Sequence, residues 1–342
     1  MSLKNLSVKI KIPKLLEDKL KNQKINQLYA KFERDLKIKQ NFAVAVSGGP
    51  DSLALAFLSK IYSIRNNVTS YFFIVDHKLR KESTKEAKFI KNLLNQFSIK
   101  CEILTWRGKK PKKNIQSIAR ESRYTLLINK CNKLKIDNIL LGHHQDDLFE
   151  NFFIRLLRGS GLKGLISFDI KTRINNKNLL RPLLSQKKEN LQFISKYVFG
   201  FFVNDPSNID VKFKRIKIRE LIDKLKIDGL DEKKFLKTIN NLRYSDKVVD
   251  FYMKENLKKN TFYSKDKKKL IIKREFFDHS YEVIFRSLSE SIKLIGKKYY
   301  AVRGRKLDKT ILNIQKNASF RQTLGGCILE KFNQTLIITK EH

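Results

Sequence analysis

The sequence predicts an α/β fold: a parallel sheet with helices on both faces, then a helical part and a small α+β part at the C-terminus. Three observations predict it. Short apolar runs alternate with segments of helical period, glycine and serine follow the first run directly, and the last part of the chain is rich in lysine. At 342 residues the chain is long enough for two domains.

The first predicted strand and helix lie in FAVAVSGGPDSLALAFLSKI, residues 42–61. The run of Val and Ala is short and continuous, which suits a strand that is buried on both faces. After Pro50 the apolar residues follow helical spacing instead. Residues 47–52 are therefore predicted to turn the chain from the strand into the helix.

This turn has the chemistry of an anion site. Its glycines let the backbone curl close to a ligand, and the amides at a helix N-terminus attract negative charge. Asp51 and Ser52 are also ordinary helix-capping residues, so a purely structural cap is the alternative. No Walker P-loop with its lysine occurs in the chain. The residues predicted to hold phosphate groups are Ser47, Gly48, Gly49, Pro50, Asp51 and Ser52.

Three more strands and three more helices are predicted before residue 160. Alternating strands and helices give a Rossmann-like parallel sheet, whose ligands bind beyond the carboxyl ends of the strands. Asp76, His77 and His143 stand at such ends, and we assign the first two to the nucleotide site. The strands are expected at 70–76, 100–106 and 137–142, and the helices at 83–97, 114–134 and from about 143 to 158.

Two carboxylates follow the fourth strand. Asp147 and Glu150 lie three residues apart, on one face of the predicted helix. Near a phosphate loop, such a pair can hold Mg²⁺ or the ammonium group of a substrate. The alternative is that acidic residues in a first helical turn merely complement the helix dipole.

Basic residues cluster on two predicted helices. Arg120 and Arg123 share one helix face, and their guanidinium groups suit phosphate oxygens, although a solvated face is the alternative. Arg155 and Arg158 end the helix before a glycine-rich exit. This exit is suited either to gripping an RNA backbone or to capping the helix.

Three regions are expected along the chain. They are a partly helical N-terminal extension (1–40), a nucleotide-binding domain (41–212) and a basic, mostly helical region (213–342). The boundary is placed near residues 210–217, after the turn NDPSN at 204–208. The alternating tail around Asn333-Gln334 predicts a β-hairpin.

Composition narrows the class of partner. Lysine and arginine number 73 against 34 acidic residues, a net charge of +39, which favours a polyanion such as nucleic acid or acidic lipid. Part of this excess is compositional bias, since lysine is abundant throughout. No run reaches transmembrane length, and three scattered cysteines indicate neither disulfides nor a zinc site. A cytoplasmic location without membrane contact is expected.

Eight segments together resemble the tRNA(Ile)-lysidine synthetases, members of the PP-loop ATP pyrophosphatase superfamily. The resemblance covers residues 42–219 and departs from the family pattern at Asn151, Asn204 and Ile216. The segments are SGGPDS (47–52), DHKLR (76–80), ARESRY (119–124), LGHHQDDLFEN (141–151), RGSGLKGL (158–165), RPLL (181–184), DPSN (205–208) and FKRIKIR (213–219).

The resemblance implies an ATP- and Mg²⁺-dependent ligation. The wobble cytidine in the CAU anticodon of tRNA(Ile) is adenylated, pyrophosphate leaves, and free L-lysine then displaces AMP. The implied catalytic residues are Asp51, which also lies near the metal, Arg123 and His143. Asp147 and Glu150 would bind the lysine ammonium. The implied tRNA-binding residues are Arg155, Arg158, Lys163, Arg215 and Arg219.

Two alternatives compete with this interpretation. A PP-loop tRNA thiolase, or another enzyme that adenylates a tRNA base, would use the same loop. Thiolases commonly need paired cysteines, which this chain lacks. A basic RNA-binding protein with an inactive nucleotide fold is the second alternative. The sequence leaves the oligomeric state open, a homodimer included.

Overall fold

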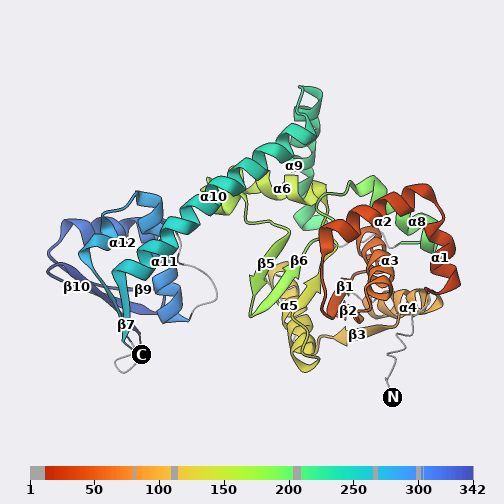
Figure 1. Ribbon diagram of the computed structural model, residues 1–342, viewed down its shortest axis with the longest axis horizontal. Coiled ribbons are helices and arrows are strands. Elements are labelled where there is room, and N and C mark those ends of the chain that lie inside the picture. Colours follow the sequence, from red (N-terminus) through yellow and green to blue (C-terminus); the bar gives the residue numbers. More distant parts are fainter. Residues whose placement is uncertain are drawn as a thin grey trace, which may run out of the picture. The chain divides into compact units, whose positions relative to one another are not determined.

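The computed structural model describes residues 12–79, 82–108, 115–202, 209–264, 269–297, 302 and 304–341. The chain divides into two compact units, Met1–Leu230 and Asp231–His342 (Figure 1). The turn predicted at 204–208, with Asn204, lies outside the described residues, as does Arg80.

The first unit is built on a six-stranded sheet in the order β3-β2-β1-β4-β6-β5. All neighbouring strands are parallel except β5, which forms an antiparallel hairpin with β6. The four strands predicted from the sequence are confirmed. The hairpin was not predicted. The strands are β1 (Phe42–Val46), β2 (Ser70–Asp76), β3 (Cys101–Thr105), β4 (Asn138–Leu140), β5 (Lys171–Ile174) and β6 (Lys177–Leu180).

Helices cover both faces of this sheet, as expected. On one face Phe42, Val44 and Val46 join the larger core, and on the other Ala43 packs with the smaller core formed by α5. The alternation follows from the two-residue period of a strand, so the run of Val and Ala supplies both faces. The helices from β1 onward are α3 (Pro50–Arg65), α4 (Ser83–Gln96), α5 (Ile115–Lys133), α6 (Gln145–Leu156) and α7 (Leu162–Leu165) between the strands and α8 (Lys188–Phe199) after β6.

The N-terminal helices α1 (Lys14–Leu20) and α2 (Gln23–Leu36) belong to the same core. Tyr29 and Phe32 of α2 are completely buried there. Lys31 donates a hydrogen bond from Nζ to the carbonyl of Ser185 at 2.7 Å, and the Ser185 hydroxyl donates to Asp35 at 2.8 Å. These residues are thus an integral layer of the domain, in addition to being partly helical as expected.

Helix α9 (Ile209–Ile227) extends the first unit. Ile218 and Ile222 are buried, and α9 packs against α6. The boundary expected at residues 212/213 therefore falls inside this helix, whereas the first compact unit ends at Leu230.

The second unit packs helices on a five-stranded antiparallel sheet, in the order β7-β8-β11-β10-β9. The hairpin predicted around Asn333-Gln334 is confirmed as β10–β11, with Asn333 in the left-handed region at φ 51°. The other three strands were not predicted. The elements are α10 (Glu232–Asn260), β7 (Thr261–Ser264), β8 (Lys269–Ile272), η2 (Arg274–Phe277), α11 (Tyr281–Gly296), α12 (Gly304–Lys316), β9 (Ser319–Leu324), β10 (Cys327–Phe332) and β11 (Thr335–Lys340).

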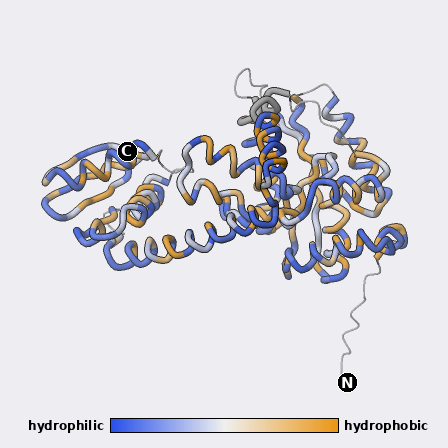
Figure 2. Tube along the Cα trace, turned by 90° about the horizontal axis from the view of Figure 1, so that it is seen from above, coloured by the Kyte–Doolittle hydropathy of each residue, from blue (hydrophilic) through white to orange (hydrophobic). Residues whose placement is uncertain are grey.

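Hydrophilic and hydrophobic positions alternate along the helices of both units (Figure 2). A helix of this kind has one apolar side for a core and one polar side for water, whereas α3 is buried on nearly all sides from Ser52 to Ser63. Among the described helices, none is both long and apolar enough to span a bilayer.

Replacing Phe32 by alanine should lower the free energy of unfolding of the first unit by about 3–5 kcal/mol, because it leaves a cavity in the main core. Denaturant titration would measure this change. Gln27→Ala, at an exposed position of the same helix, is the matched control and should stay within about 0.5 kcal/mol. Equal stability of both variants would show that α2 is a dispensable appendage.

Candidate active site

The loop between β1 and α3 is organised around one hydroxyl group. Ser52 Oγ accepts hydrogen bonds from the amides of Ser47 and Gly48, each at 3.1 Å, and donates to the carbonyl of Gly49 at 2.9 Å. Gly48 has a φ of 86°, which an L side chain rarely adopts. The sequence Ser-Gly-Gly-Pro-Asp-Ser therefore folds back on its own last serine.

This fold-back leaves the start of α3 open to an anion. Pro50 is the first helical residue and has no amide hydrogen, and Gly49 caps the helix without a side-chain hydrogen bond. Among the described residues, the amides of Asp51 and Ser52 donate no backbone–backbone hydrogen bond. Unpaired amides at a helix N-terminus bind phosphate, as the sequence predicted for this loop.

Gly142, directly after β4, makes this loop possible. A Cβ atom at this position would lie 3.1 Å from the Ser52 amide nitrogen and 3.2 Å from the Asp51 carbonyl carbon. Both neighbours are backbone atoms, so a side chain here would displace the loop. The sequence places a glycine at the end of the fourth strand, but its pattern does not show which segment comes close.

His144 lies between two carboxylates. Its Nε2 atom is 3.7 Å from Asp51 Oδ2 and 3.6 Å from Asp147 Oδ2. The same residue caps α6: Nδ1 accepts a hydrogen bond from the Asp146 amide, and the His144 amide donates to Asp147 Oδ2 at 3.0 Å. The cap fixes the imidazole and holds the end of β1 beside the end of β4.

Asp51 carries an unpaired carboxylate oxygen. Its Oδ1 is buried, and no hydrogen-bond partner for it is found among the described residues. Burial raises the pKa of Asp51, an effect that the charge on His144 opposes and the charge on Asp147 reinforces. A buried carboxylate oxygen without a partner is stabilised by a cation. Asp51 Oδ1 therefore fits as a ligand of a hard metal ion that also binds phosphate oxygens.

His143, which the sequence singled out, is close enough to Asp147 for that charge to act on it, but unlike His144 it forms none of the described ion pairs with the two carboxylates. Its ring meets Phe168 edge-on, with the centroids 5.0 Å apart, and its Nδ1 is buried without a partner. Burial lowers the pKa of His143 to about 4; the charge on Asp147 acts to raise this pKa, and the charges on Arg181 and Arg120 lower it further. His143 is therefore neutral near pH 7 and can act only as a hydrogen-bonding group.

Arg181, in the segment RPLL, supports this wall of the site. It is buried, donates from Nη1 to the carbonyl of Asp169 at 2.7 Å and to Thr172 at 3.1 Å, and stacks over Phe168. Its Nε atom is buried without a partner. Sequence reasoning gave this residue no role, although a buried arginine next to a phosphate site is a strong candidate for anion contact.

Asp76 shapes the turn after β2. Its Oδ1 accepts from the Lys78 amide at 3.0 Å and from Ser83 at 2.8 Å, and its Oδ2 accepts from Thr84 at 2.6 Å. Burial alone would raise the pKa of Asp76, but these hydrogen bonds outweigh it and the pKa is lowered. The carboxylate thus holds its own loop, and its predicted contact with nucleotide stays a prediction.

His77 and Arg123 meet at the same edge. Arg123 donates from Nε to His77 Nε2 at 3.4 Å, although 46 residues separate them. Burial and the Arg123 charge lower the pKa of His77 to about 4. The arginine side chain is exposed, and its Nε atom reaches the strand ends from α5.

Glu150 is one helical turn from Asp147 but faces α9. It is buried, its Oε1 accepts a hydrogen bond from Arg219, and its Oε2 lies 4.0 Å from Arg215 Nη1. This hydrogen bond and charge raise the pKa of Arg219 against the lowering effect of burial. The structure therefore unites a predicted lysine-binding residue with two predicted tRNA-binding residues.

The remaining predicted RNA contacts lie around the end of α6. Arg158 and Lys163 are exposed, Arg155 is half-buried, and Gly159 turns the chain with a φ of 65°. None of the three cationic groups is consumed by a carboxylate among the described ion pairs. They lie in and after the last turn of α6, whereas Asp147 lies in its first turn, and their positive charge is compatible with a polyanion.

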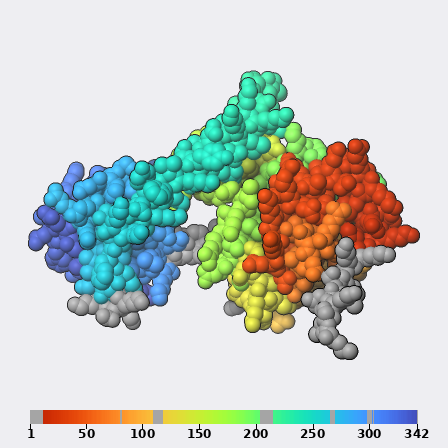
Figure 3. Space-filling view, in the orientation of Figure 1, coloured from red at the N-terminus to blue at the C-terminus, as the bar shows by residue number. Residues whose placement is uncertain are grey.

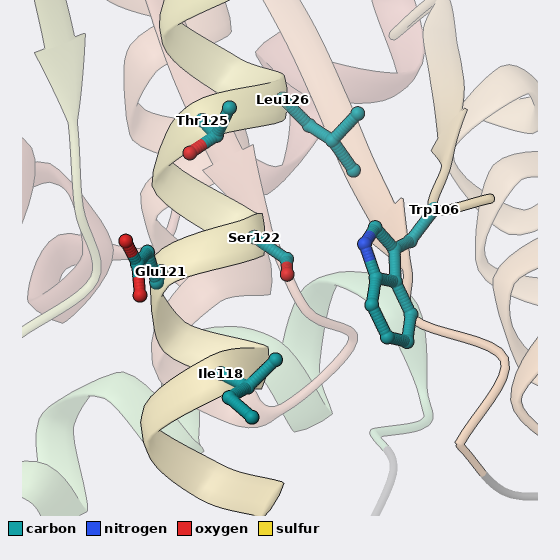
Figure 4. A pocket seen from close by; sticks show the side chains of 6 residues that line it. All are labelled: Trp106, Ile118, Glu121, Ser122, Thr125 and Leu126. Carbon is teal, nitrogen blue, oxygen red and sulfur yellow. The ribbon is translucent and has the colours of Figure 1, made fainter. Parts of the chain in front are cut away.

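A pocket of about 240 Å³ lies between the end of β3 and α5. Figure 4 shows the indole of Trp106 opposite Ser122 and Leu126 of α5. The Trp106 amide donates to the carbonyl of Asp76 at 2.9 Å, which places the pocket at the same sheet edge as the phosphate loop. The sequence analysis predicted no pocket here, although Trp106 is the chain's only tryptophan.

The cysteines take no part in the site. All three are buried and free, and burial raises the pKa of Cys101 to about 12 and of Cys131 and Cys327 to about 11. Within the described ranges, no group of three or more His, Cys, Asp or Glu side chains is arranged to hold a metal. A metal that binds here must therefore complete its shell with water or substrate oxygens.

Gly142→Ala should weaken ATP binding roughly tenfold, equivalent to ~1.4 kcal/mol, because the new methyl group pushes the Asp51–Ser52 backbone out of position. Isothermal titration with ATP would measure the affinity. Gly161→Ala is the control, since a Cβ there meets no atom within 4 Å. Unchanged ATP affinity in Gly142→Ala would show that the close contact at Gly142 is not needed for nucleotide binding.

His77 and His143 should make the protein less stable in mild acid. Each has a pKa of about 4 against an ordinary 6.5, so the unfolded chain takes up these protons first. The free energy of unfolding should fall as the pH drops from 6.5 to about 4. Denaturant titrations at pH 5 and 7.5 should show a smaller difference for the His77→Gln/His143→Gln variant than for the wild-type chain. An equal difference would mean that other groups cause the effect.

The comparisons with known proteins agree on one family. Residues 17–225 match the PP-loop domain. The tRNA(Ile)-lysidine synthase of Orientia tsutsugamushi (strain Boryong) is 33% identical over 322 residues, which are 92% of this chain and 71% of that protein. The enzyme of the same name from Rickettsia bellii (strain OSU 85-389) is 30% identical, over 92% and 74%. That from Wolbachia pipientis wMel is 33% identical, over 87% and 70%.

A solved structure shares the fold. The U34-tRNA thiolase NcsA from Methanococcus maripaludis, with its 4Fe-4S cluster, superposes with a TM-score of 0.56 at 16% identity, over 65% of this chain and 78% of that one. At this identity the likeness supports the fold alone. The domain match and the relatives show the family: the chain belongs to the tRNA(Ile)-lysidine synthases.

Proposed function

We propose that this protein is a carbon–nitrogen ligase that joins L-lysine to the wobble cytidine in the CAU anticodon of tRNA(Ile). The cytosine O2 atom attacks the α-phosphorus of ATP, and pyrophosphate leaves. The lysine ε-amine then attacks C2, and the oxygen leaves with AMP. The observation that carries the proposal is the juxtaposition of an open phosphate loop with the Asp51–His144–Asp147 cluster.

The loop supplies the phosphate site. The amides of Asp51 and Ser52 lie in the first turn of α3, and the hydroxyl of Ser47 lies beside Ser52. At this end of the helix the dipole favours negative charge. Ser52 keeps the loop curled, so its role in binding is indirect. Fixed donors of this kind need no reorganisation when the charge moves to the leaving pyrophosphate.

Asp51 would hold Mg²⁺. Its buried, unpaired Oδ1 and its raised pKa indicate a carboxylate that is stabilised by an added cation. Mg²⁺ commonly uses one or two carboxylates together with substrate phosphates and water, which fits the single carboxylate found here. When bound, the ion neutralises charge on the phosphates.

Asp147 is the better placed of the two predicted lysine ligands. Its carboxylate shares His144 with Asp51, so an ammonium group bound there lies close to the phosphate loop. Glu150 is already paired with Arg219, and a lysine ammonium would have to share or replace that partner. The proposed division is that Asp147 contacts lysine directly and that Glu150 sets the position of α9 beside it.

Arg123 and His143 would act where the adenylate forms. Arg123 carries a permanent charge at the sheet edge, suited to an α-phosphate oxygen. His143 is neutral and buried, so its contribution is a hydrogen bond. The exposed Arg158 and Lys163 and the half-buried Arg155, all near the end of α6, are proposed to contact the tRNA backbone.

Nucleoside analysis of tRNA(Ile) incubated with the protein, ATP, Mg²⁺ and labelled lysine tests this function. Lysidine should form only when all components are present, with pyrophosphate and AMP released. Labelled lysine in the RNA also excludes a thiolase, which would leave no such label. The dispersed, buried cysteines already argue against sulfur transfer. Pyrophosphate release without label in the RNA would refute the proposal.

Asp147→Asn should raise the KM for lysine roughly 10- to 100-fold, because a charge-assisted hydrogen bond to the ammonium group is lost. ATP affinity should change little. Asp146→Asn removes the neighbouring charge and is the matched control. Steady-state kinetics with varied lysine would measure both variants. If Asp147→Asn kept the wild-type KM, lysine would have to bind elsewhere.

A further inference from the structure

The long helix α10 of the second unit exposes four large apolar side chains. The exposed fractions are 63% for Tyr244, 57% for Val248, 60% for Phe251 and 52% for Tyr252. We call these four residues the α10 stripe. Their spacing of four, three and one residues puts them on one side of a helix.

The stripe is not the side on which α10 packs. Ile239, Met253 and Asn256 are the buried residues of the helix, and Asn256 donates to the carbonyl of Phe276 at 3.1 Å within the second unit's core. The surface of α10 is in view in Figure 3. Three aromatic rings thus remain in water along one side of a helix that already has its core contacts.

Charge on α10 is segregated in the same way. Asp246 and Asp250 turn toward the second unit's core, where they accept from the buried Arg286 at 2.6 and 3.3 Å. The stripe side carries one carboxylate, Glu255, which pairs with Lys259 at 3.3 Å. Besides Lys259, the exposed lysines on or beside the stripe are Lys233, Lys234, Lys237, Lys247 and Lys258. The aromatic side of the helix is therefore positively charged.

This combination favours one kind of partner. A second copy of the chain would bring like charges together on the same face, which disfavours self-association. A fully paired RNA helix would use the lysines but leave the rings unused, because its bases are stacked inside. Unpaired nucleotides offer both phosphates for the lysines and exposed base faces for the rings.

We propose that the α10 stripe binds unpaired nucleotides of the RNA substrate, with bases stacked on Tyr244, Phe251 and Tyr252 and phosphates held by the neighbouring lysines. Lys247 already lies over the Tyr244 ring, 5.4 Å from its centroid, so cation and ring act at one place. From Tyr244 to Tyr252 the helix rises roughly 12 Å, room for a short single-stranded segment. The identity of this RNA as tRNA(Ile) rests on the proposed function.

The test compares two RNA probes on the full chain. One is a transcript of tRNA(Ile) with the CAU anticodon, and the other is a fully paired RNA duplex of similar length. Tyr244→Ala/Phe251→Ala/Tyr252→Ala should weaken transcript binding about tenfold or more, with duplex binding changed less than about twofold. Fluorescence anisotropy at several salt concentrations would measure both affinities.

Two control variants separate stacking from charge. Phe332→Ala removes an aromatic ring of 60% exposure from β10, in the same unit, and should leave both affinities unchanged. Lys237→Gln/Lys247→Gln should weaken both probes and lower the salt slope by roughly one to two, whereas the aromatic variant keeps the wild-type slope. Phe251→Ala alone is the second variant if the triple variant unfolds.

Three outcomes would overturn the proposal. The aromatic variant could bind the transcript like the wild type, or lose both probes equally. Sedimentation could also show a wild-type dimer that the aromatic variant breaks, making the stripe a contact between copies. Failure of the proposed function is distinguishable: transcript binding that depends on the stripe, without lysidine formation, would refute only the ligation.

Discussion

The site depends on the contact between two backbone segments at the carboxyl edge of a parallel sheet. The loop after β1 and the chain after β4 approach so closely that a Cβ at Gly142 would lie 3.1 Å from the Ser52 amide nitrogen, tighter than most Cβ contacts. Because β1 and β4 are adjacent and parallel, their carboxyl ends lie at the same edge of the sheet, and residues nearly 100 positions apart become neighbours. Phosphate donors and carboxylates can meet only because this contact has no side chain in it.

Carboxylates in the site are held in different electrostatic states. Asp76 accepts three hydrogen bonds, and Glu150 accepts one from Arg219 and has Arg215 4.0 Å from its other oxygen, whereas Asp51 Oδ1 is buried with no hydrogen-bond partner among the described residues. Burial without a partner disfavours the charged form, so Asp51 has the most to gain from a cation. The same low-dielectric surroundings keep His77 and His143 neutral, which leaves permanent positive charge to arginine.

Sequence reasoning found the parts of the structure whose signals are local. Strands β1 to β4 are apolar runs, and the glycine turn and Asp147 follow two of them directly. Strand β5 was missed because its sequence, KTRI, is polar and half exposed at the sheet edge. Local pattern also cannot show that His144 rather than His143 meets the carboxylates, because this depends on the helix cap. The pairing of Glu150 with Arg219 spans 69 residues and depends on where α9 packs.

The N-terminal helices are linked to the site through hydrogen bonds with the segment that follows β6. Lys31 of α2 donates a hydrogen bond to the carbonyl of Ser185, and Asp35 accepts one from its hydroxyl. The carbonyl of the next residue, Gln186, accepts a hydrogen bond from the amide of Gln145 at the start of α6. A chain of hydrogen bonds thus connects the N-terminal helices to the first turn of α6, which positions Asp147. Random mutagenesis screened for catalytic tuning should recover compensating changes in α2, a helix that no inspection of substrate contacts would nominate.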